Sequence, residues 1–230
     1  MSGAPELDAL YPFLRGAVQD SIGLDSALLR SVEYKVAESR ETSARFFAEQ
    51  APALIAAARA LAGIWQSGGR LFAMGNGGSS CDAAHITVEF LHPITAGRRA
   101  LPAVNLIADI AMISAVGNDV SFDQVFARQI EAHGRAGDGL IGISTSGNSA
   151  NLIAAFATAR RMRLVTFGLA GGNGGRMKTE GLVDHCLVVP SDSVHRIQEC
   201  HVATYHILWD LVHTLLADSR GSAQAAGAAA

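Results

Sequence analysis

The chain has 230 residues, a formal net charge of −3, 49% apolar residues and 17% charged residues. This length fits one large domain, or one domain with an extension, and the apolar share is enough for a sizeable core. The charge balance provides no basic patch, so we expect no direct binding of nucleic acid. No apolar run reaches about eighteen residues, so we expect no membrane span.

Two features of the composition bear on assembly and compartment. The charged share is below the usual quarter, which indicates that much surface is buried between subunits. The three cysteines, Cys81, Cys186 and Cys200, lie in apolar contexts without a preceding secretory signal. We therefore expect reduced thiols in a cytoplasmic protein. Cys81 lies close to a glycine-rich turn, where we expect a packed thiol rather than a nucleophile.

Residues 1–67 are predicted to form a helical extension that joins the subunits of an oligomer. Asp25 is expected to cap one helix, and apolar residues at helical spacing predict a second helix from Ser43 to Trp65. Gly68 and Gly69 would end this second helix. A helical pair before the first strand exceeds what one sheet needs, and a bundle between subunits would bury it.

The stretch 70–90 (RLFAMGNGGSSCDAAHITVEF) reads as a buried strand, a glycine-rich turn and a helix. Gly75, Gly77 and Gly78 allow a tight turn and close backbone approach. Ser79 and Ser80 are expected to cap the helix. Such a turn presents free N–H groups and the positive end of a helix, which favour phosphate. The turn alone is not diagnostic, because every doubly wound fold needs one like it.

His85 and Glu89 lie four residues apart in that helix, so they share one face. An imidazole and a carboxylate on one face can ligate a metal or exchange protons. A surface ion pair is the alternative, and the spacing alone does not separate these interpretations.

Strands and helices alternate along the rest of the chain. Strands are predicted at 101–107, 139–143, 164–169 and 186–189, helices at 110–116, 122–133, 150–161 and 193–217, a turn at 117–119 and a glycine-rich loop at 171–175. This alternation predicts an α/β fold with a parallel sheet and right-handed crossovers. The Gly/Ala-rich residues 219–230 are expected to form a disordered tail.

A second candidate phosphate site follows the strand at 139–143. The sequence GISTSGNSAN places four hydroxyls, those of Ser144, Thr145, Ser146 and Ser149, between a strand end and a helix start. Backbone amides and hydroxyls there favour an anion, although a serine-rich capping turn is the alternative. Two such turns at the carboxyl ends of parallel strands would face one crevice.

Four motifs in order, GNGGSSCDAAH, GND, GISTSGNSAN and RIQECHVATYH, together resemble the SIS-domain family of phosphosugar-binding proteins, and within it the phosphoheptose isomerases. The resemblance covers roughly residues 41–216. It implies a three-layer sandwich in which helices flank a five-stranded parallel sheet, with an SIS domain at 68–218. It also implies a homotetramer with active sites at subunit interfaces, and the substrate is expected to be a sugar phosphate.

The resemblance further implies the site residues. Zinc would be bound by His85, Glu89, Gln198 and His206. Glu89 would be the catalytic base, with His206 as its partner. Substrate and phosphate contacts would fall on Asn76, Gly77, Gly78, Ser79, Glu89, Asn118, Asp119, Ser144, Thr145, Ser146, Ser149 and Gln198. Glu89 cannot be a tight ligand and a free base without compromise, and the sequence does not decide which role dominates.

The spacing of Gln198 and His206 is unusual for two ligands of one ion. Eight residues span about 12 Å along an ideal helix. Either the side chains lean together, the helix begins irregularly, or the ligands come from different subunits. His201 lies between them, and we expect a packed or supporting role for it.

The implied reaction converts sedoheptulose 7-phosphate to D-glycero-D-manno-heptose 7-phosphate through an enediol, which needs a base near one carbon and an acid near the carbonyl oxygen. A non-catalytic SIS protein that binds the bacterial replication initiator is the alternative. The intact set of His, Glu, Gln and His favours the enzyme. A sugar-phosphate-sensing regulator would need a helix-turn-helix domain, which residues 1–67 have neither the basic charge nor the length to form.

Overall fold

A computed structural model describes residues 21–227, and the side chains of residues 23–217 within them. Five parallel strands form one sheet in the order β2-β1-β3-β4-β5. Their bounds are β1 Leu71–Gly75, β2 Ala103–Asn105, β3 Gly139–Ser144, β4 Val165–Gly171 and β5 His185–Val189. The predicted α/β class with a five-stranded parallel sheet is confirmed. Along the described residues, no helix is both long and apolar enough to cross a membrane.

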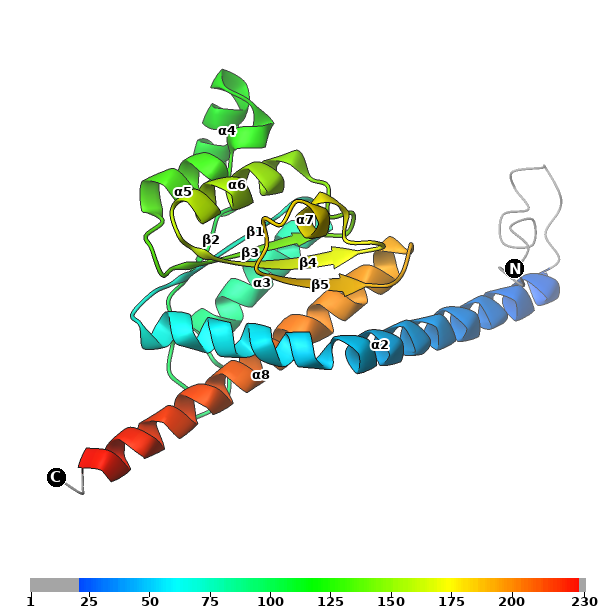
Figure 1. Cartoon of the computed structure of the whole chain (residues 1–230). Helices are drawn as coiled ribbons and strands as arrows, with labels where there is room; N and C mark the ends of the chain where they lie inside the picture. The colour runs from blue at the N-terminus through cyan, green and yellow to red at the C-terminus, as the bar shows by residue number, and fades with distance from the viewer. Residues whose placement is uncertain (1–20, 228–230) are drawn as a thin grey trace.

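Helices cover both faces of the sheet, as Figure 1 shows. One layer contains α2 (Ser21–Gln66), α3 (Gly78–Leu91) and α8 (Val194–Gly227). The other contains α4 (Ile110–Asp119), the 3₁₀ turn η2 (Phe122–Gln124), α5 (Ala127–His133), α6 (Ala150–Arg161) and the short α7 (Gly175–Thr179). Alternate residues of β1 enter the two cores: Leu71 packs with the α2 layer, and Phe72 packs with the opposite layer. Burial on both faces explains why the strands read as continuous apolar runs.

The predicted N-terminal pair of helices is wrong. The described residues before β1 form the single helix α2, 46 residues long, with Asp25 and Ser43 inside it and Pro52 in its interior. The stretch between the two expected helices, 36–43 (VAESRETS), is polar but contains no glycine or proline. Polar side chains in this stretch can face solvent without ending the helix, because a helix is interrupted by residues such as glycine and proline. Residues 1–20 of the predicted extension lie outside the described residues.

Several predicted helix boundaries also differ. The expected turn at 117–119 is the last part of α4, which Asp109 caps by accepting from the Met112 N–H at 2.9 Å. The expected helix 122–133 is divided into η2 and α5. Ser79 and Ser80 do not cap α3, because the N-cap is Gly77 at φ +54. Short-range hydrogen bonds decide these ends, and they leave little trace in hydrophobic periodicity.

The C-terminal helix is longer than predicted. α8 continues to Gly227, so most of the stretch expected as a disordered tail is helical, and residues 228–230 lie outside the described residues. Residues 219–230 contain six alanines and two glycines, and alanine is the best helix former, which favours continuation of the helix.

The sheet has a switch point beside β1. The chain leaves β1 for the edge strand β2 and later returns to β3 on the other side of β1. At the carboxyl end of the sheet, Gly75 of β1 lies in register with Ile143 of β3. The two glycine- and serine-rich turns therefore leave the sheet side by side. Open α/β sheets bind ligands at this position.

Glycine is required in the second of these turns. Gly147 has φ +65, and a Cβ atom there would lie 2.1 Å from the carbonyl oxygen of Gly174. We expect Gly147→Ala to lower the free energy of unfolding by about 1–3 kcal/mol, because it combines a strained backbone with a clash against main chain.

Gly63 is the matched control. It lies inside α2, and a Cβ atom at this residue would have no other atom within 4 Å. Gly63→Ala should therefore raise stability by about 0.5–1 kcal/mol. Urea unfolding of both variants measures the difference. Equal stabilities for the two variants would contradict the strain assigned to Gly147.

Candidate active site

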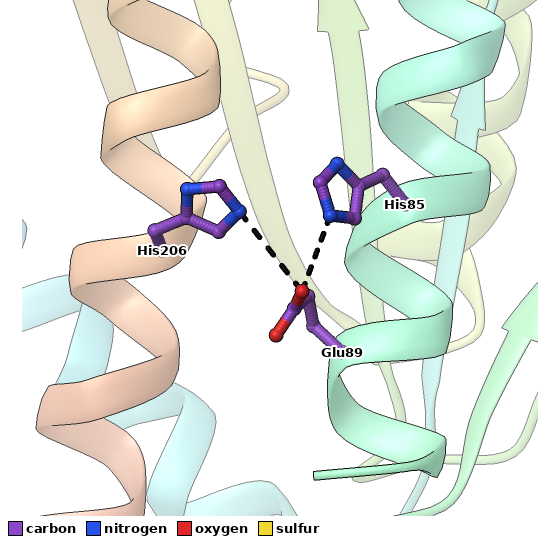
Figure 2. A group of neighbouring side chains, drawn as sticks. All are labelled: His85, Glu89 and His206. Carbon is purple, nitrogen blue, oxygen red and sulfur yellow. Dashed lines mark hydrogen bonds and ion pairs between the residues drawn. The ribbon is translucent and has the colours of Figure 1, made fainter. Parts of the chain in front are cut away.

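Three polar side chains from two neighbouring helices converge at one point (Figure 2). His85 and Glu89 lie on α3, and His206 lies on α8. The His85 Nε2 atom is 3.1 Å from Glu89 Oε1, and His206 Nε2 is 4.0 Å from the same oxygen. One ligand atom from each residue lies within 4.8 Å of the others. The carboxylate thus faces two imidazoles.

The packing of α3 against α8 sets this geometry. Trp209 Nε1–H donates to the backbone carbonyl of Glu89 at 2.8 Å, which joins the two helices one turn beyond the cluster. The Arg98 guanidinium lies 4.6 Å from the Trp209 ring centroid and pairs with Asp210 at 2.7 Å. The side chain of Glu89 is 22% exposed, so the carboxylate lies partly under the two imidazoles while remaining open to a ligand.

Buried polar residues stand behind His85. Its Nδ1 atom lies 2.9 Å from the Tyr205 hydroxyl, and that hydroxyl lies 3.5 Å from Asp82 Oδ1. Burial raises the pKa of the Asp82 carboxyl, while the Tyr205 hydrogen bond and the nearby His85 act in the opposite direction. Sequence reasoning missed both residues. Asp82 lies one helical turn before His85, and Tyr205 directly precedes His206. Their positions next to the two histidines are the sequence signal that could have identified them.

His201 is a packed residue, as expected. It is buried, and its Nε2 atom lies 3.2 Å from the carbonyl oxygen of Ala170. Burial lowers its pKa to about 4, so the ring is neutral at physiological pH. It therefore supports the contact between α8 and β4.

Gln198 lies away from the cluster within one chain. Its amide nitrogen would be 2.4 Å from a Cβ on Gly78, so it rests on the first residue of α3. Gly78 and His85 are seven residues apart, or about 10 Å along the helix. Gln198, His195, Asp82 and Gly78 help to line an open cleft of about 330 Å³.

The two turns at the sheet's carboxyl edge are joined by a pair of asparagines. Asn76, in the turn after β1, and Asn151, in the first turn of α6, each donate an amide hydrogen to the other's oxygen at 2.9 Å. Asn151 is 2% exposed, and its oxygen also accepts from the Leu152 N–H. Sequence reasoning placed Asn76 at the site and missed Asn151, the asparagine that ends the third motif, GISTSGNSAN.

Two of the four hydroxyls in the second turn, those of Ser144 and Ser149, contact each other. Ser144 Oγ lies 3.1 Å from Ser149 Oγ and accepts the Gly147 N–H at 3.2 Å. Ser146 Oγ accepts the Asn148 N–H at 3.2 Å. Ser144 is buried, whereas Ser146 is exposed. The turn thus combines hydroxyls and backbone N–H groups at the start of α6, an arrangement suited to an anion.

Asn118 and Asp119 are not brought to this cluster within one chain. Both are exposed at the end of α4, where Asn118 donates to Asp119 at 2.7 Å. Figure 1 shows α4 standing out from the layer of α5 and α6, on the far side of the sheet from α3 and α8.

The three convergent donors fit a metal ion. Two imidazole nitrogens and a carboxylate oxygen are ligands that zinc accepts, and catalytic zinc sites commonly have three protein ligands and one open position. Donors within 4.8 Å of one another need only small side-chain shifts to reach one ion. The cluster is therefore a possible divalent-metal site.

Comparisons with known proteins place the chain in a family. A family model described as "SIS domain" matches residues 34–171. A phosphoheptose isomerase of Pelodictyon phaeoclathratiforme is 42% identical over 200 residues, which cover 86% of this chain and 90% of that protein. One of Solidesulfovibrio magneticus is 44% identical over 184 residues, covering 80% and 89%. The chain belongs to the phosphoheptose isomerase family of SIS-domain proteins.

Solved structures agree with this membership of the phosphoheptose isomerase family. The phosphoheptose isomerase GmhA of Neisseria gonorrhoeae superposes with a TM-score of 0.75 at 35% identity, covering 81% of this chain and 99% of that one. The phosphoheptose isomerase of Francisella tularensis gives 0.72 at 35% identity, covering 80% and 98%. The family expected from the four motifs is confirmed, and so is the SIS fold.

The asparagine pair generates a prediction about how the two turns are coupled. Asn76→Ala and Asn151→Ala should each lower stability, because each leaves a partner amide unpaired, in Asn76→Ala a buried one. In the double variant the second loss should be smaller. We expect a coupling free energy of about 0.5–3 kcal/mol in a double-mutant cycle measured by urea unfolding.

Asn173→Ala is the matched control, since its exposed side chain accepts only the nearby Gly175 N–H. Combined with Asn76→Ala, it should give additive effects. Additive losses for Asn76 with Asn151 would show that the amide pair does not couple the turns.

Proposed function

We propose that this member of the phosphoheptose isomerase family converts sedoheptulose 7-phosphate to D-glycero-D-manno-heptose 7-phosphate through an enediol. The single observation that carries the proposal is the carboxylate of Glu89 facing two imidazoles, on the helix that begins at the first of the two glycine- and serine-rich turns. The names of the relatives support the same ketose/aldose isomerisation.

The reaction moves a proton between adjacent carbons. We assign removal of that proton to Glu89 and proton exchange at the carbonyl oxygen to His206. Both imidazole contacts fall on Oε1 of Glu89 (Figure 2), which leaves Oε2 available to the substrate. If Oε1 of Glu89 binds the metal and Oε2 accepts the proton, the same side chain can serve as a ligand and as a base.

Zinc is the proposed cofactor. His85, Glu89 and His206 would hold it, and Gln198 would complete the set from a second copy of the chain, one of the arrangements that its spacing from His206 allows. When bound, zinc would polarise the substrate carbonyl and stabilise negative charge on its oxygen.

The phosphate is proposed to lie between the two turns. Backbone N–H groups and side chains of the first turn face it, together with the hydroxyls of the second; the proposed contacts are Asn76, Gly77, Gly78, Ser79, Ser144, Thr145, Ser146 and Ser149. The parallel register of β1 and β3 supports this, because it brings both turns to one edge. Gln198 and Glu89 would contact the sugar.

A homotetramer with interface sites is proposed as the active form. Large apolar side chains are exposed on the N-terminal half of α2, among them Leu29, Val32 and Val36, and Figure 1 shows this half extending beyond the sheet. Asn118 and Asp119 on the projecting α4 would reach the site of another copy. The free thiols of Cys81, Cys186 and Cys200 support work in a reducing cytoplasm. Cys81 is exposed, so the packed thiol expected there is wrong.

The alternative was a non-catalytic SIS protein that binds the bacterial replication initiator. The comparisons do not support it, since the relatives that cover most of the chain are named as isomerases. Incubation of the purified protein with sedoheptulose 7-phosphate, followed by NMR detection of the aldose, tests the enzyme directly.

Glu89→Gln separates catalysis from binding. The substitution keeps the size and one oxygen but removes the base. We expect kcat at saturating substrate and zinc to fall about a hundred- to ten-thousand-fold, because a positioned base contributes in the transition state.

The control for this variant is Glu180→Gln, which makes the same change at an exposed residue paired with Arg176. It should leave kcat unchanged. A Glu89→Gln enzyme within about threefold of wild type, small beside the expected range, would remove Glu89 from the role of base.

The phosphate proposal is tested by the double substitution Ser144→Ala with Thr145→Ala. We expect KM for the sugar phosphate to rise at least tenfold, because charge-assisted hydrogen bonds to the phosphate are lost. Ser67→Ala is the control, since this hydroxyl lies before β1 at the opposite edge of the sheet and donates to Gly63. An unchanged KM in the double variant would mean that the phosphate is held elsewhere.

A further inference from the structure

We propose that Tyr205, backed by Asp82, is a positioning residue that fixes the hydrogen of His85 on Nδ1 and so prepares Nε2 to bind metal. The inference rests on the metal site proposed above. It concerns side chains that none of the four sequence motifs marks as a ligand.

The first step is geometric. The Tyr205 hydroxyl lies 2.9 Å from His85 Nδ1, and the two ring centroids are 5.2 Å apart in an edge arrangement. Tyr205 is 1% exposed, and Asp82 is 8% exposed. The Tyr205 side of the contact is therefore shielded from water, which would otherwise compete for Nδ1, while the His85 side chain itself is 42% exposed.

The second step concerns the hydrogens. A histidine that binds a metal through Nε2 carries its hydrogen on Nδ1, and the partner of Nδ1 fixes this tautomer. Nδ1–H would donate to the Tyr205 oxygen, and the phenol hydrogen would then point to Asp82 Oδ1, 3.5 Å away. A hydroxyl can donate and accept at once, so it can link the two groups.

The third step decides between the two tautomers. With the hydrogen on Nε2, His85 would donate to Glu89 at 3.1 Å, and Nδ1 would accept from Tyr205. That state leaves Asp82 without a donor, and its Oδ2 atom is already buried without a partner. An unsatisfied buried carboxylate is costly. In the Nδ1–H state Glu89 loses the His85 donor instead, but its side chain is 22% exposed and water can replace that donor, whereas Asp82 Oδ2 is buried. Asp82 therefore draws the phenol hydrogen toward itself and favours Nδ1–H on His85.

The arrangement also explains the order of residues on α8. Consecutive helical residues point about 100° apart. Tyr205 is buried behind His85, whereas His206 is exposed at the opening of the cluster. One turn of α8 thus provides both His206, a proposed ligand, and Tyr205, which positions the proposed ligand His85.

The test measures zinc affinity by competition with a chromophoric chelator. Tyr205→Phe keeps the ring and removes the hydroxyl, and we expect the zinc Kd to rise about 10- to 100-fold, the usual cost of losing such a partner. Asp82→Asn should raise it by a smaller factor. Thr204→Val is the matched control, because it removes a neighbouring buried hydroxyl that bonds only the Cys200 carbonyl, and it should change Kd less than about twofold, well below the loss expected for Tyr205→Phe.

Two further readouts separate positioning from general structural damage. The Tm of the metal-free protein should be similar in Tyr205→Phe and Thr204→Val, while the rise in Tm on adding zinc should shrink only in Tyr205→Phe. Imidazole ¹⁵N spectra of metal-free wild type should show His85 with its hydrogen on Nδ1, and Tyr205→Phe should lose this preference.

An unchanged Kd in Tyr205→Phe, or a wild-type His85 with its hydrogen on Nε2, would overturn the inference. If Tyr205→Phe does not fold, Asp82→Asn decides by the same criteria. Wild-type protein that binds no zinc would overturn the inference together with the metal site. The isomerase assay on sedoheptulose 7-phosphate decides the reaction separately.

Discussion

The contact between α3 and α8 is the constraint on which the candidate site depends. These helices are more than a hundred residues apart in sequence, yet one turn of each supplies the convergent donors. The Trp209 indole bonded to the Glu89 carbonyl, and the Tyr205 hydroxyl against His85, hold the two helices at a fixed offset along their axes. A slip of one residue would rotate each side chain by about 100° and separate the donors. Buried contacts behind the site therefore determine the geometry at its opening.

The sheet is the second constraint, because it sets where the glycine- and serine-rich turns after β1 and β3 lie. β1 and β3 are neighbours in parallel register, so their turns leave the same edge. Glycine lets each turn come close to other main chain, as at Gly75, where a Cβ would lie 2.3 Å from the Ser79 carbonyl oxygen. The Asn76–Asn151 pair then joins the turns across their gap. The helix contact and the sheet edge are linked directly, because α3 begins where the first turn ends.

Much of this arrangement was predictable because local chemistry determines it. The central strands were found as short apolar runs, and α6 begins and ends where its pattern indicated. α2 and α4 were misjudged because helix ends depend on single hydrogen bonds and on the absence of a breaker, which periodicity does not report. In the site, spacing alone identified His85 with Glu89, whereas His206 came only from family resemblance. Tyr205, Asp82 and Asn151 were missed because their significance lies in tertiary contacts between segments about 75–120 residues apart.

The interpretation that spacing left open, a surface ion pair between His85 and Glu89, is not enough to explain the observed surroundings. An exposed pair at this spacing contributes only about 0.3–0.5 kcal/mol and needs no further partners. Here a second imidazole approaches the same carboxylate oxygen. A buried phenol and a buried carboxylate occupy the far side of the first ring, at the desolvation cost that buried polar groups carry. A surface ion pair between His85 and Glu89 does not explain why Tyr205 and Asp82 are buried at this desolvation cost. A ligand or a reacting group that needs one tautomer and one orientation of His85 does give that reason.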